Sequence, residues 1–319
     1  MRSSRENHLD RARFIFGVSI VAAASLLAAG LLAAGLALRH SAAQHGRRNA
    51  DVPVVRTHRF NTSAAWSLIT REVHYGQRPA GSRQLRALAA SLVRLLPRGH
   101  LEPLPDQGLQ NIVGSLPGRR PGLVIGAHYD TLASPRGFVG ANNGAAGSAI
   151  VVELARDLQR LHRPRGAPAI TFVLFDGEEP AAGLPEDSGD FYHAGLRGSR
   201  AYVEAHRQDA SAMVLLDYVA GRGLRLPREG SSTPQLWAQI RAAAAVVSAG
   251  AVFPGETQTT ILDDHTPFLR AGIPAVDLID WSYDGHSNAD TLDKLSQRSV
   301  AAVGETLVEF ARTYRAPAR

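Results

Sequence analysis

The sequence predicts an α/β fold, a three-layer α/β/α sandwich with a mixed central sheet, preceded by one N-terminal transmembrane helix. Apolar runs with the length of buried strands occur at residues 123–127, 170–175 and 213–216. Amphipathic helical patterns alternate with them or follow them, at residues 145–162, 234–249 and 299–314. Helices that alternate with buried strands are typical of a sheet covered on both faces.

The N-terminal region is interpreted as a membrane anchor. Residues 14–38 carry no charged side chain and are rich in Ala, Leu, Val and Gly. Such a stretch is long enough to span a bilayer and exceeds the apolar core of a signal peptide, which is about 7–15 residues. Residues 1–13 contain Arg2, Arg5, Arg11 and Arg13. Because positive charge next to a membrane span favours the cytoplasmic side, these residues are expected in the cytoplasm and the rest of the chain outside it. Cleavage within residues 34–43, giving a secreted protein, is the alternative.

The remaining elements follow in chain order. Residues 39–58 are polar and Arg-rich, which predicts a linker before a domain at residues 59–316. That domain opens with two helical patterns and then two strands, at residues 64–74, 82–96, 100–104 and 110–116. Residues 180–195 are rich in Pro, Gly, Asp and Ser, which indicates a long loop that is either a functional lid or a surface insertion.

Composition excludes several classes of partner and site. The formal charge of +6 comes almost entirely from arginine, since Lys294 is the one lysine. These arginines are scattered and no aromatic-basic platform accompanies them, so no nucleic-acid partner is expected. The chain has no cysteine, which excludes disulfides and cysteine-ligated zinc.

Polar side chains follow each predicted strand at the point where it ends. His128 follows the first, Glu178 and Glu179 the second, Asp217 the third, and His286 comes after a fourth. Open α/β sheets carry their sites at the carboxyl ends of the strands, where loops bring distant residues together. Imidazole nitrogen and carboxylate oxygen are suitable ligands for zinc. The pattern therefore predicts a metal site.

The two adjacent glutamates are expected to have different roles. They cannot easily bind one ion in the same way, so Glu179 is taken as a ligand and Glu178 as the general base, a role that suits a carboxylate whose pKa is raised by burial. Asp130 lies two residues after His128 and could hold the other nitrogen of its imidazole.

Several motifs resemble metallopeptidase family 28, which contains zinc aminopeptidases and, in a related branch, glutaminyl cyclases. The resemblance extends from about Phe60 to Arg312 and rests on His-Tyr-Asp at 128–130, Phe-Asp-Gly-Glu-Glu at 175–179, Gly-Ser-Arg at 198–200, Leu-Asp at 216–217 and Asp-Asp-His-Thr-Pro-Phe at 263–268. It implies a zinc exopeptidase-like sandwich. It further implies that one zinc is bound by His128 and Asp217 and the other by Glu179 and His286, with Glu178 as the base.

One position departs from the family pattern. Where family members carry an Asp that bridges two metals, in a segment like Gly-Ala-Asn-Asp-Gly, this chain has Asn143. A neutral amide leaves a positive charge uncompensated between two zinc ions and bridges them poorly. Loss of even an outer partner costs about 10–100-fold in metal affinity. One or two zinc ions are therefore considered, and one is the expected number.

The segment around residue 265 offers a competing ligand. His265 could replace His286, but residues 285–291 match the family's ligand loop, so His286 is preferred. Asp264 and His265 are then expected to support a ligand from behind or to line the substrate pocket. Trp281 is a further candidate for that pocket, although an aromatic residue near a loop is commonly a packing residue.

The expected function is that of a zinc-dependent, aminopeptidase-type exopeptidase acting on peptides with a free N-terminus. Zinc would polarise the scissile carbonyl, and Glu178 would take a proton from water and return it to the leaving amine. The first alternative is a glutaminyl-peptide cyclotransferase that forms N-terminal pyroglutamate. Residues 263–268 look more like that branch, whereas Gly285 stands where its pattern has Trp. The second alternative is a metal-depleted binding protein, for which Asn143 is the single indication.

Overall fold

The computed structural model describes residues 52–105, 108–181 and 190–316. No helix within these ranges is long and apolar enough to cross a bilayer. The predicted cytoplasmic segment and membrane span, residues 1–38, lie outside the described residues, as does most of the predicted linker. Its last part packs on the domain, since Val52 and Val55 are buried in the core and the Arg56 N–H donates to the Val247 carbonyl at 3.1 Å.

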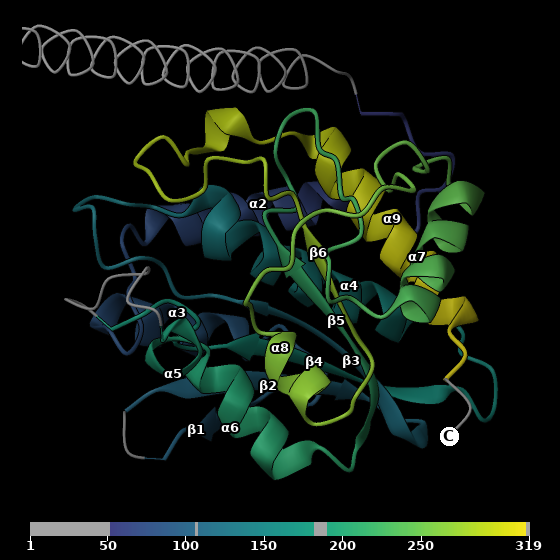
Figure 1. Cartoon of the computed structure of the whole chain (residues 1–319), viewed down its shortest axis with the longest axis horizontal. Coiled ribbons are helices and arrows are strands. Elements are labelled where there is room, and N and C mark those ends of the chain that lie inside the picture. The colour runs from purple at the N-terminus through teal and green to yellow at the C-terminus, as the bar shows by residue number, and fades with distance from the viewer. Residues whose placement is uncertain (1–51, 106–107, 182–189, 317–319) are drawn as a thin grey trace, which may run out of the picture. The chain divides into compact units, whose positions relative to one another are not determined.

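The centre of the domain is a mixed sheet, as the sequence predicts, and it has six strands within the described residues (Figure 1). Their order across the sheet is β1-β2-β4-β3-β5-β6. The strands β4, β3, β5 and β6 run parallel to one another, whereas β2 is antiparallel to both β1 and β4. The strand bounds are His100–Pro103 (β1), Gln110–Leu116 (β2), Arg119–His128 (β3), Pro168–Phe175 (β4), Ala210–Asp217 (β5) and Ala275–Ile279 (β6).

Helices cover both faces of this sheet. One apolar cluster joins the sheet to α2 (Thr62–His74), α3 (Arg83–Leu92), α4 (Gly147–Arg160), α7 (Pro234–Val246) and α9 (Gln297–Thr313). A second cluster joins the opposite face to α6 (Arg197–His206) and α8 (Thr266–Arg270). The remaining helical segments are short: η1 (Ala141–Ala146), α5 (Phe191–Ala194) and η2 (Leu292–Lys294).

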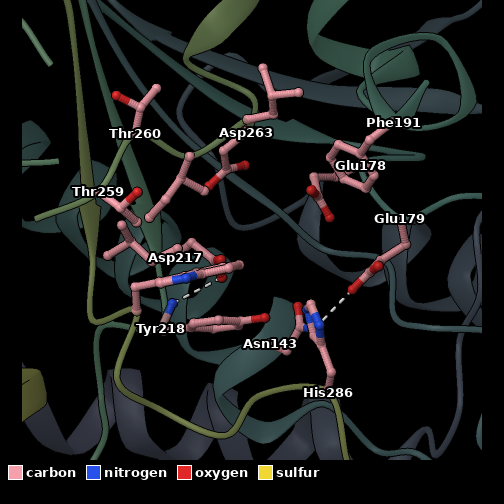
Figure 2. Close-up of a pocket in the computed structure, with 14 residues that line it drawn as sticks. Asn143, Glu178, Glu179, Phe191, Asp217, Tyr218, Thr259, Thr260, Asp263 and His286 are labelled. Atoms are coloured by element: carbon pink, nitrogen blue, oxygen red, sulfur yellow. Dashed lines mark hydrogen bonds between the residues drawn. The ribbon is translucent and has the colours of Figure 1, made fainter. Parts of the chain in front are cut away.

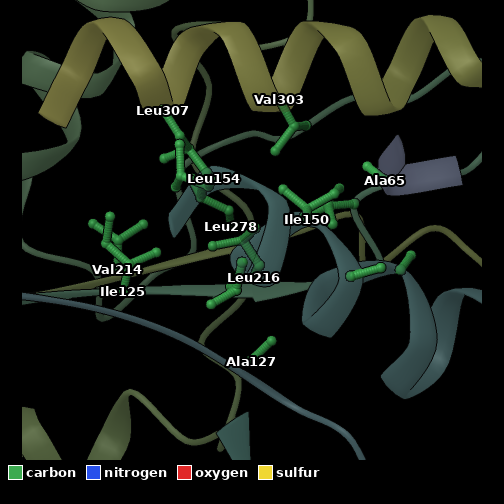
Figure 3. Close-up of a cluster of buried hydrophobic side chains, with 14 of the residues drawn as sticks. Ala65, Ile125, Ala127, Ile150, Leu154, Val214, Leu216, Leu278, Val303 and Leu307 are labelled. Carbon is green, nitrogen blue, oxygen red and sulfur yellow. The ribbon is translucent and has the colours of Figure 1, made fainter. Parts of the chain in front are cut away.

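Alternation along the strands produces the two clusters. In β3, Leu123 and Ile125 belong to the larger cluster, while Val124 between them belongs to the smaller one. Successive side chains of a strand point to opposite faces, so an unbroken apolar run supplies both layers at once. Figure 3 shows the larger cluster, in which Ile150, Leu154, Val303 and Leu307 of the helices lie above the sheet.

The predicted helices and strands are present with shifted ends. The helix predicted at residues 82–96 is capped by Ser82, whose Oγ accepts from the Leu85 N–H at 3.1 Å, but it ends at Leu92. Pro97 follows, and Arg98 adopts a left-handed φ of 53°, which no continuing helix allows. Of the loop predicted at residues 180–195, residues 182–189 lie outside the described residues. Its last part contains α5, a helix of four residues that is too short for periodicity to predict.

Candidate active site

The predicted site residues converge at one edge of the sheet. His128 ends β3 and Asp217 ends the adjacent strand β5. Glu178 and Glu179 follow the end of β4, and His286 follows β6. Because these four strands are parallel, their carboxyl ends meet at the same edge. Figure 2 shows the resulting pocket, and a cavity of about 520 Å³ lies there, a size typical of small-molecule sites.

The pocket combines ionisable groups with an apolar wall. Of the predicted residues, those that line it are Asn143, Glu178, Glu179, Asp217, Trp281 and His286. Sequence reasoning missed the rest of the lining, which is Phe191, Tyr218, residues 259–262, Asp263 and Ile279. Residues 259–262 are Thr-Thr-Ile-Leu in a segment with neither helical nor strand structure, so no pattern in the sequence marks them.

Aromatic rings surround His286. Tyr218 stacks on Trp281 with ring centroids 6.3 Å apart and planes inclined by 14°. Both rings meet His286 edge-on, at 6.0 Å and 6.4 Å. Trp281 is 46% exposed, so it forms the rim of the pocket and is available to a ligand. A Cβ at Gly285 would lie 2.5 Å from Tyr218 Cζ, so no larger residue fits there beside this ring.

Asp130 positions the two glutamates. Its two carboxylate oxygens accept the backbone N–H groups of Glu178 and Glu179 at 3.3 Å and 3.2 Å. The Nδ1 atom of His128 lies 3.6 Å from Asp130 Oδ1, which exceeds hydrogen-bond length. Asp130 therefore orients the turn after β4 as well as facing the imidazole that it was predicted to hold.

His128 is buried among carboxylates behind the pocket wall. Its Nε2 atom lies 3.4 Å from Asp217 Oδ1, and its Nδ1 atom lies 3.8 Å from Glu178 Oε2. Burial by itself would lower the pKa of His128, but contacts with Asp130, Asp217 and Glu178 outweigh it and raise that pKa well above the usual range. The site thus concentrates negative charge around one imidazole.

Both glutamates are hard to ionise without a cation nearby. Burial, and then the charge of Glu179, raises the pKa of Glu178 well above its usual range. Burial also raises the pKa of Glu179 to about 7, although His128 and His286 oppose that shift. Such buried carboxylates can act as proton acceptors near neutral pH or bind a metal ion.

A tight turn presents Asn143 to the pocket. Asp290 accepts the backbone N–H groups of Asn142 and Asn143, and the next residue, Gly144, has a φ of +99°. A Cβ at Gly144 would lie 2.3 Å from the Asp130 carbonyl oxygen, so only glycine allows this close approach. The Gly-Ala-Asn-Asn-Gly segment is therefore a rigid link between β3 and α4.

The Asn143 amide, at the predicted bridging position, contacts Glu179 and Gly285. Its Nδ2 group donates to Glu179 Oε1 at 2.8 Å and to the Gly285 carbonyl at 3.4 Å. With the amide turned the other way, oxygen would face oxygen at both contacts, so this orientation follows from the hydrogen bonds. The amide thus gives the buried Glu179 carboxylate a hydrogen-bond donor.

The donor set fits zinc chemically. Glu179, Asp217 and His286 line the pocket, and His128 lies behind its wall with Nε2 3.4 Å from Asp217 Oδ1, so imidazole and carboxylate groups gather there. The tightest convergence of three such groups among the described residues is elsewhere, formed by Asp263, His265 and Asp277. The ligand roles of the pocket residues stay a prediction.

His265 does not line the pocket. It is completely buried, and its Nε2 atom lies 2.9 Å from Ser231 Oγ and 3.2 Å from Glu229 Oε2. Asp264 is buried as well, and its backbone N–H donates to Asp263 Oδ1 at 2.6 Å. Asp277 was missed, although a charged residue inside the apolar strand Ala-Val-Asp-Leu-Ile is a signal that the sequence offered.

Comparisons with known proteins identify relatives in sequence and in fold. A glutaminyl-peptide cyclotransferase-like protein of Mus musculus is 27% identical over 293 residues, which cover 78% of this chain and 75% of the relative. The crystal structure of a leucine aminopeptidase precursor from Bacteroides thetaiotaomicron is similar in fold, with a TM-score of 0.72 and 24% identity over 82% of this chain and 100% of that chain. A glutaminyl cyclase of Porphyromonas gingivalis gives a TM-score of 0.68 and 25% identity, over 80% of this chain and 99% of that chain.

The family is decided by a match over more than half of the chain. The profile of Peptidase family M28 matches residues 111–311, which include every predicted site residue from His128 to His286. The chain therefore belongs to peptidase family M28, within which it is similar in sequence to glutaminyl-peptide cyclotransferases and in fold to zinc exopeptidases.

Proposed function

We propose that this protein is a glutaminyl-peptide cyclotransferase, which converts an N-terminal glutamine into pyroglutamate. The observation that carries the proposal is the hydrogen bond of 2.8 Å between Asn143 Nδ2 and Glu179 Oε1. We take position 143 as the one where a two-zinc hydrolase needs a bridging carboxylate, and this chain has a neutral amide there. Cyclisation needs no metal-activated water, and relatives that carry the cyclotransferase name support this choice over the hydrolase that the sequence alone favoured.

In this reaction the substrate's own amine is the nucleophile. Its nitrogen attacks the side-chain amide carbonyl, a new C–N bond closes the five-membered lactam ring, and the bond to the original amide nitrogen breaks to release ammonia. Glu178 accepts the proton from the attacking amine and transfers it to the leaving nitrogen. Burial raises the pKa of Glu178, which makes it suited to both accepting and returning a proton.

Zinc, when bound, would polarise the amide carbonyl and stabilise the charge that develops on its oxygen. The residues that would hold it are the imidazoles of His128 and His286 and the carboxylates of Glu179 and Asp217. Asp130 keeps the two glutamates in their relative positions through their backbone N–H groups. Glu178 lines the same pocket as three of these donors, Glu179, Asp217 and His286 (Figure 2).

The aromatic wall removes an objection to this proposal. Gly285 stands where the cyclase pattern has Trp, but the ring of Tyr218 already fills the space beside Gly285. Tyr218 and Trp281 supply the aromatic surface next to His286 from other segments of the chain. Such a wall would pack against the glutamine side chain and exclude water from the reacting carbonyl.

Two substrates distinguish cyclisation from hydrolysis. The purified zinc-loaded chain is expected to release ammonia from a peptide with N-terminal Gln. Mass spectrometry should then find a product whose mass is lower than that of the peptide by the mass of ammonia. A matched peptide with N-terminal Leu should stay intact. Release of free leucine, with the Gln peptide unchanged, would contradict the proposal.

Aminopeptidase activity is the second candidate, and the pair His128–Asp217 favours it. These two groups lie 3.4 Å apart, a separation suited to two ligands of one ion, and Glu178 lies 3.8 Å from the same imidazole. With water in place of the substrate amine, the same base would serve hydrolysis. A metal-depleted binding protein, the third candidate, is distinguished by the absence of zinc from the purified chain.

We further propose that residues 14–38 anchor this chain in a membrane with its family M28 domain outside the cytoplasm. An epitope added after Arg319 is expected to be accessible from outside the cytoplasm, with the full-length chain in the membrane fraction, because the long uncharged span follows four arginines. Protection of the epitope from protease in cells made permeable only on the outer face would refute this orientation. A soluble mature form would instead support cleavage.

A further inference from the structure

We infer that Asp263, His265 and Asp277 form a second cation site, separate from the pocket donors and selective for a divalent transition metal such as zinc. One ligand atom from each lies within 4.8 Å of the other two, and all three residues are buried. The site joins two elements on one side of the pocket. Asp277 lies in the middle of β6, whereas Asp263 and His265 directly precede α8.

Glu229 defines which nitrogen of His265 is free to bind. The Glu229 carboxylate accepts the backbone N–H of Ile261 at 3.0 Å and the hydroxyl groups of Ser231 and Ser232. It therefore acts only as a hydrogen-bond acceptor. Its Oε2 atom is also 3.2 Å from His265 Nε2. A carboxylate at that distance requires hydrogen on Nε2, which leaves the lone pair of the neutral imidazole on Nδ1. This carboxylate–imidazole arrangement is the one that commonly supports a metal-bound histidine.

The free side of the imidazole faces carboxylates that have no partner. Among the residues that the structure describes, His265 Nδ1, both oxygens of Asp277 and Asp263 Oδ2 are buried without a hydrogen-bond partner. Nδ1 lies 3.9 Å from Asp277 Oδ2, too far for a hydrogen bond. A tetrahedral ion with bonds of about 2.0–2.2 Å holds its ligand atoms roughly 3.3–3.6 Å apart, so a small contraction would let all three bind one ion.

The donor types indicate the class of cation. An imidazole with two carboxylates suits zinc and similar transition metals, whereas calcium and magnesium prefer ligand sets made of oxygen. The ion would reach the cluster from the pocket, because Asp263 belongs to the pocket wall as well. It would therefore fix the wall beside Asp217 without occupying the donors predicted for catalysis.

A rival arrangement is a proton shared between Asp263 and Asp277, with no metal at all. The two explanations differ in what an Asp277→Asn substitution does. Removing a buried carboxylate that lacks a partner should leave the metal-free chain as stable as the wild type or more stable. If the cluster binds a cation, the same substitution removes a ligand and raises the zinc dissociation constant at least about 10–100-fold.

The test uses the full-length chain in detergent and measures zinc per chain and melting temperature, with chelator and then with buffered zinc. Asp264→Asn is the matched control, because it neutralises an equally buried neighbour that is outside the three-residue group. Asp277→Asn and His265→Gln are each expected to lose close to one zinc per chain. Asp264→Asn is expected to lose none. Combining Asp277→Asn with Glu179→Ala should lose zinc additively, because the pocket donors are separate.

Three outcomes would overturn the inference. The first is an unchanged zinc content in Asp277→Asn and His265→Gln. The second is an equal loss in Asp264→Asn, which would indicate general disruption of the buried cluster. The third is that zinc changes the melting temperature of neither the wild type nor Asp277→Asn, while pH does. That result would indicate a shared proton. Calcium at the same concentration should reproduce none of the zinc effects.

Discussion

Glu178→Gln is expected to lower the turnover number about 10²–10⁴-fold while leaving the zinc content unchanged. The substitution keeps the size of the side chain and removes its ability to accept a proton. The residue's position does not depend on the carboxylate, because its backbone N–H is held by Asp130 and its carbonyl accepts the Leu196 N–H at 3.1 Å. Steady-state kinetics on the preferred substrate, together with metal analysis of the same sample, measures both quantities.

The neighbouring positions should behave in the opposite way. Glu179→Ala and His286→Ala each remove a predicted ligand, so metal and activity should be lost together. Excess zinc should restore part of the activity in these variants, whereas it should restore none in Glu178→Gln. This contrast separates a ligand from a base.

Glu72→Gln is a matched control for neutralising a buried glutamate. Burial raises the pKa of Glu72 to about 8, and its side chain accepts from Ser148 Oγ at 2.7 Å, away from the pocket. Glutamine can replace a protonated glutamate there, so turnover should stay close to that of the wild type. Normal turnover in Glu178→Gln would show that another group takes the proton.

The sheet and the strand-end residues could be predicted because their signals are local. An apolar run that ends in a polar group, such as residues 123–127 before His128, indicates both a buried strand and a side chain at its carboxyl end. Since parallel strands meet at one edge, His128, Asp217 and the two glutamates could be grouped without knowing the strand order.

The contacts across the site could not be predicted, because they depend on segments far apart in the chain. Asn143 and Glu179 meet through the turn at Gly144 and the turn after β4, and neither turn alone specifies the contact. The packing of Tyr218 against Gly285 likewise requires the loops after two different strands to be placed together. His265 and Asp277 come within 3.9 Å of each other only once α8 and β6 are assembled.

Asn143→Asp is expected to raise the number of zinc ions in the pocket from nearer one toward two, with about a 10–100-fold gain in affinity for the second pocket ion. In the wild type, the amide donates to Glu179 and thereby competes with a cation for that carboxylate. The substitution replaces this donor with a negatively charged acceptor of almost the same size. The carboxylates of residues 143 and 179 would then repel each other, and a metal ion between them would relieve that repulsion. Zinc per chain, measured for both proteins in the same metal buffer, decides the prediction.

Asn142→Asp provides the matched control, because it makes the same chemical change one residue earlier. The Asn142 side chain does not line the pocket, and its Oδ1 atom accepts the Ala220 N–H at 2.9 Å, a hydrogen bond that an aspartate can keep. Asn142→Asp should therefore leave the zinc content unchanged. If both variants gain zinc, added charge near the pocket is sufficient and no bridging position is involved. If the wild type already binds two ions tightly in its pocket, or Asn143→Asp gains none, the amide at residue 143 does not limit metal binding.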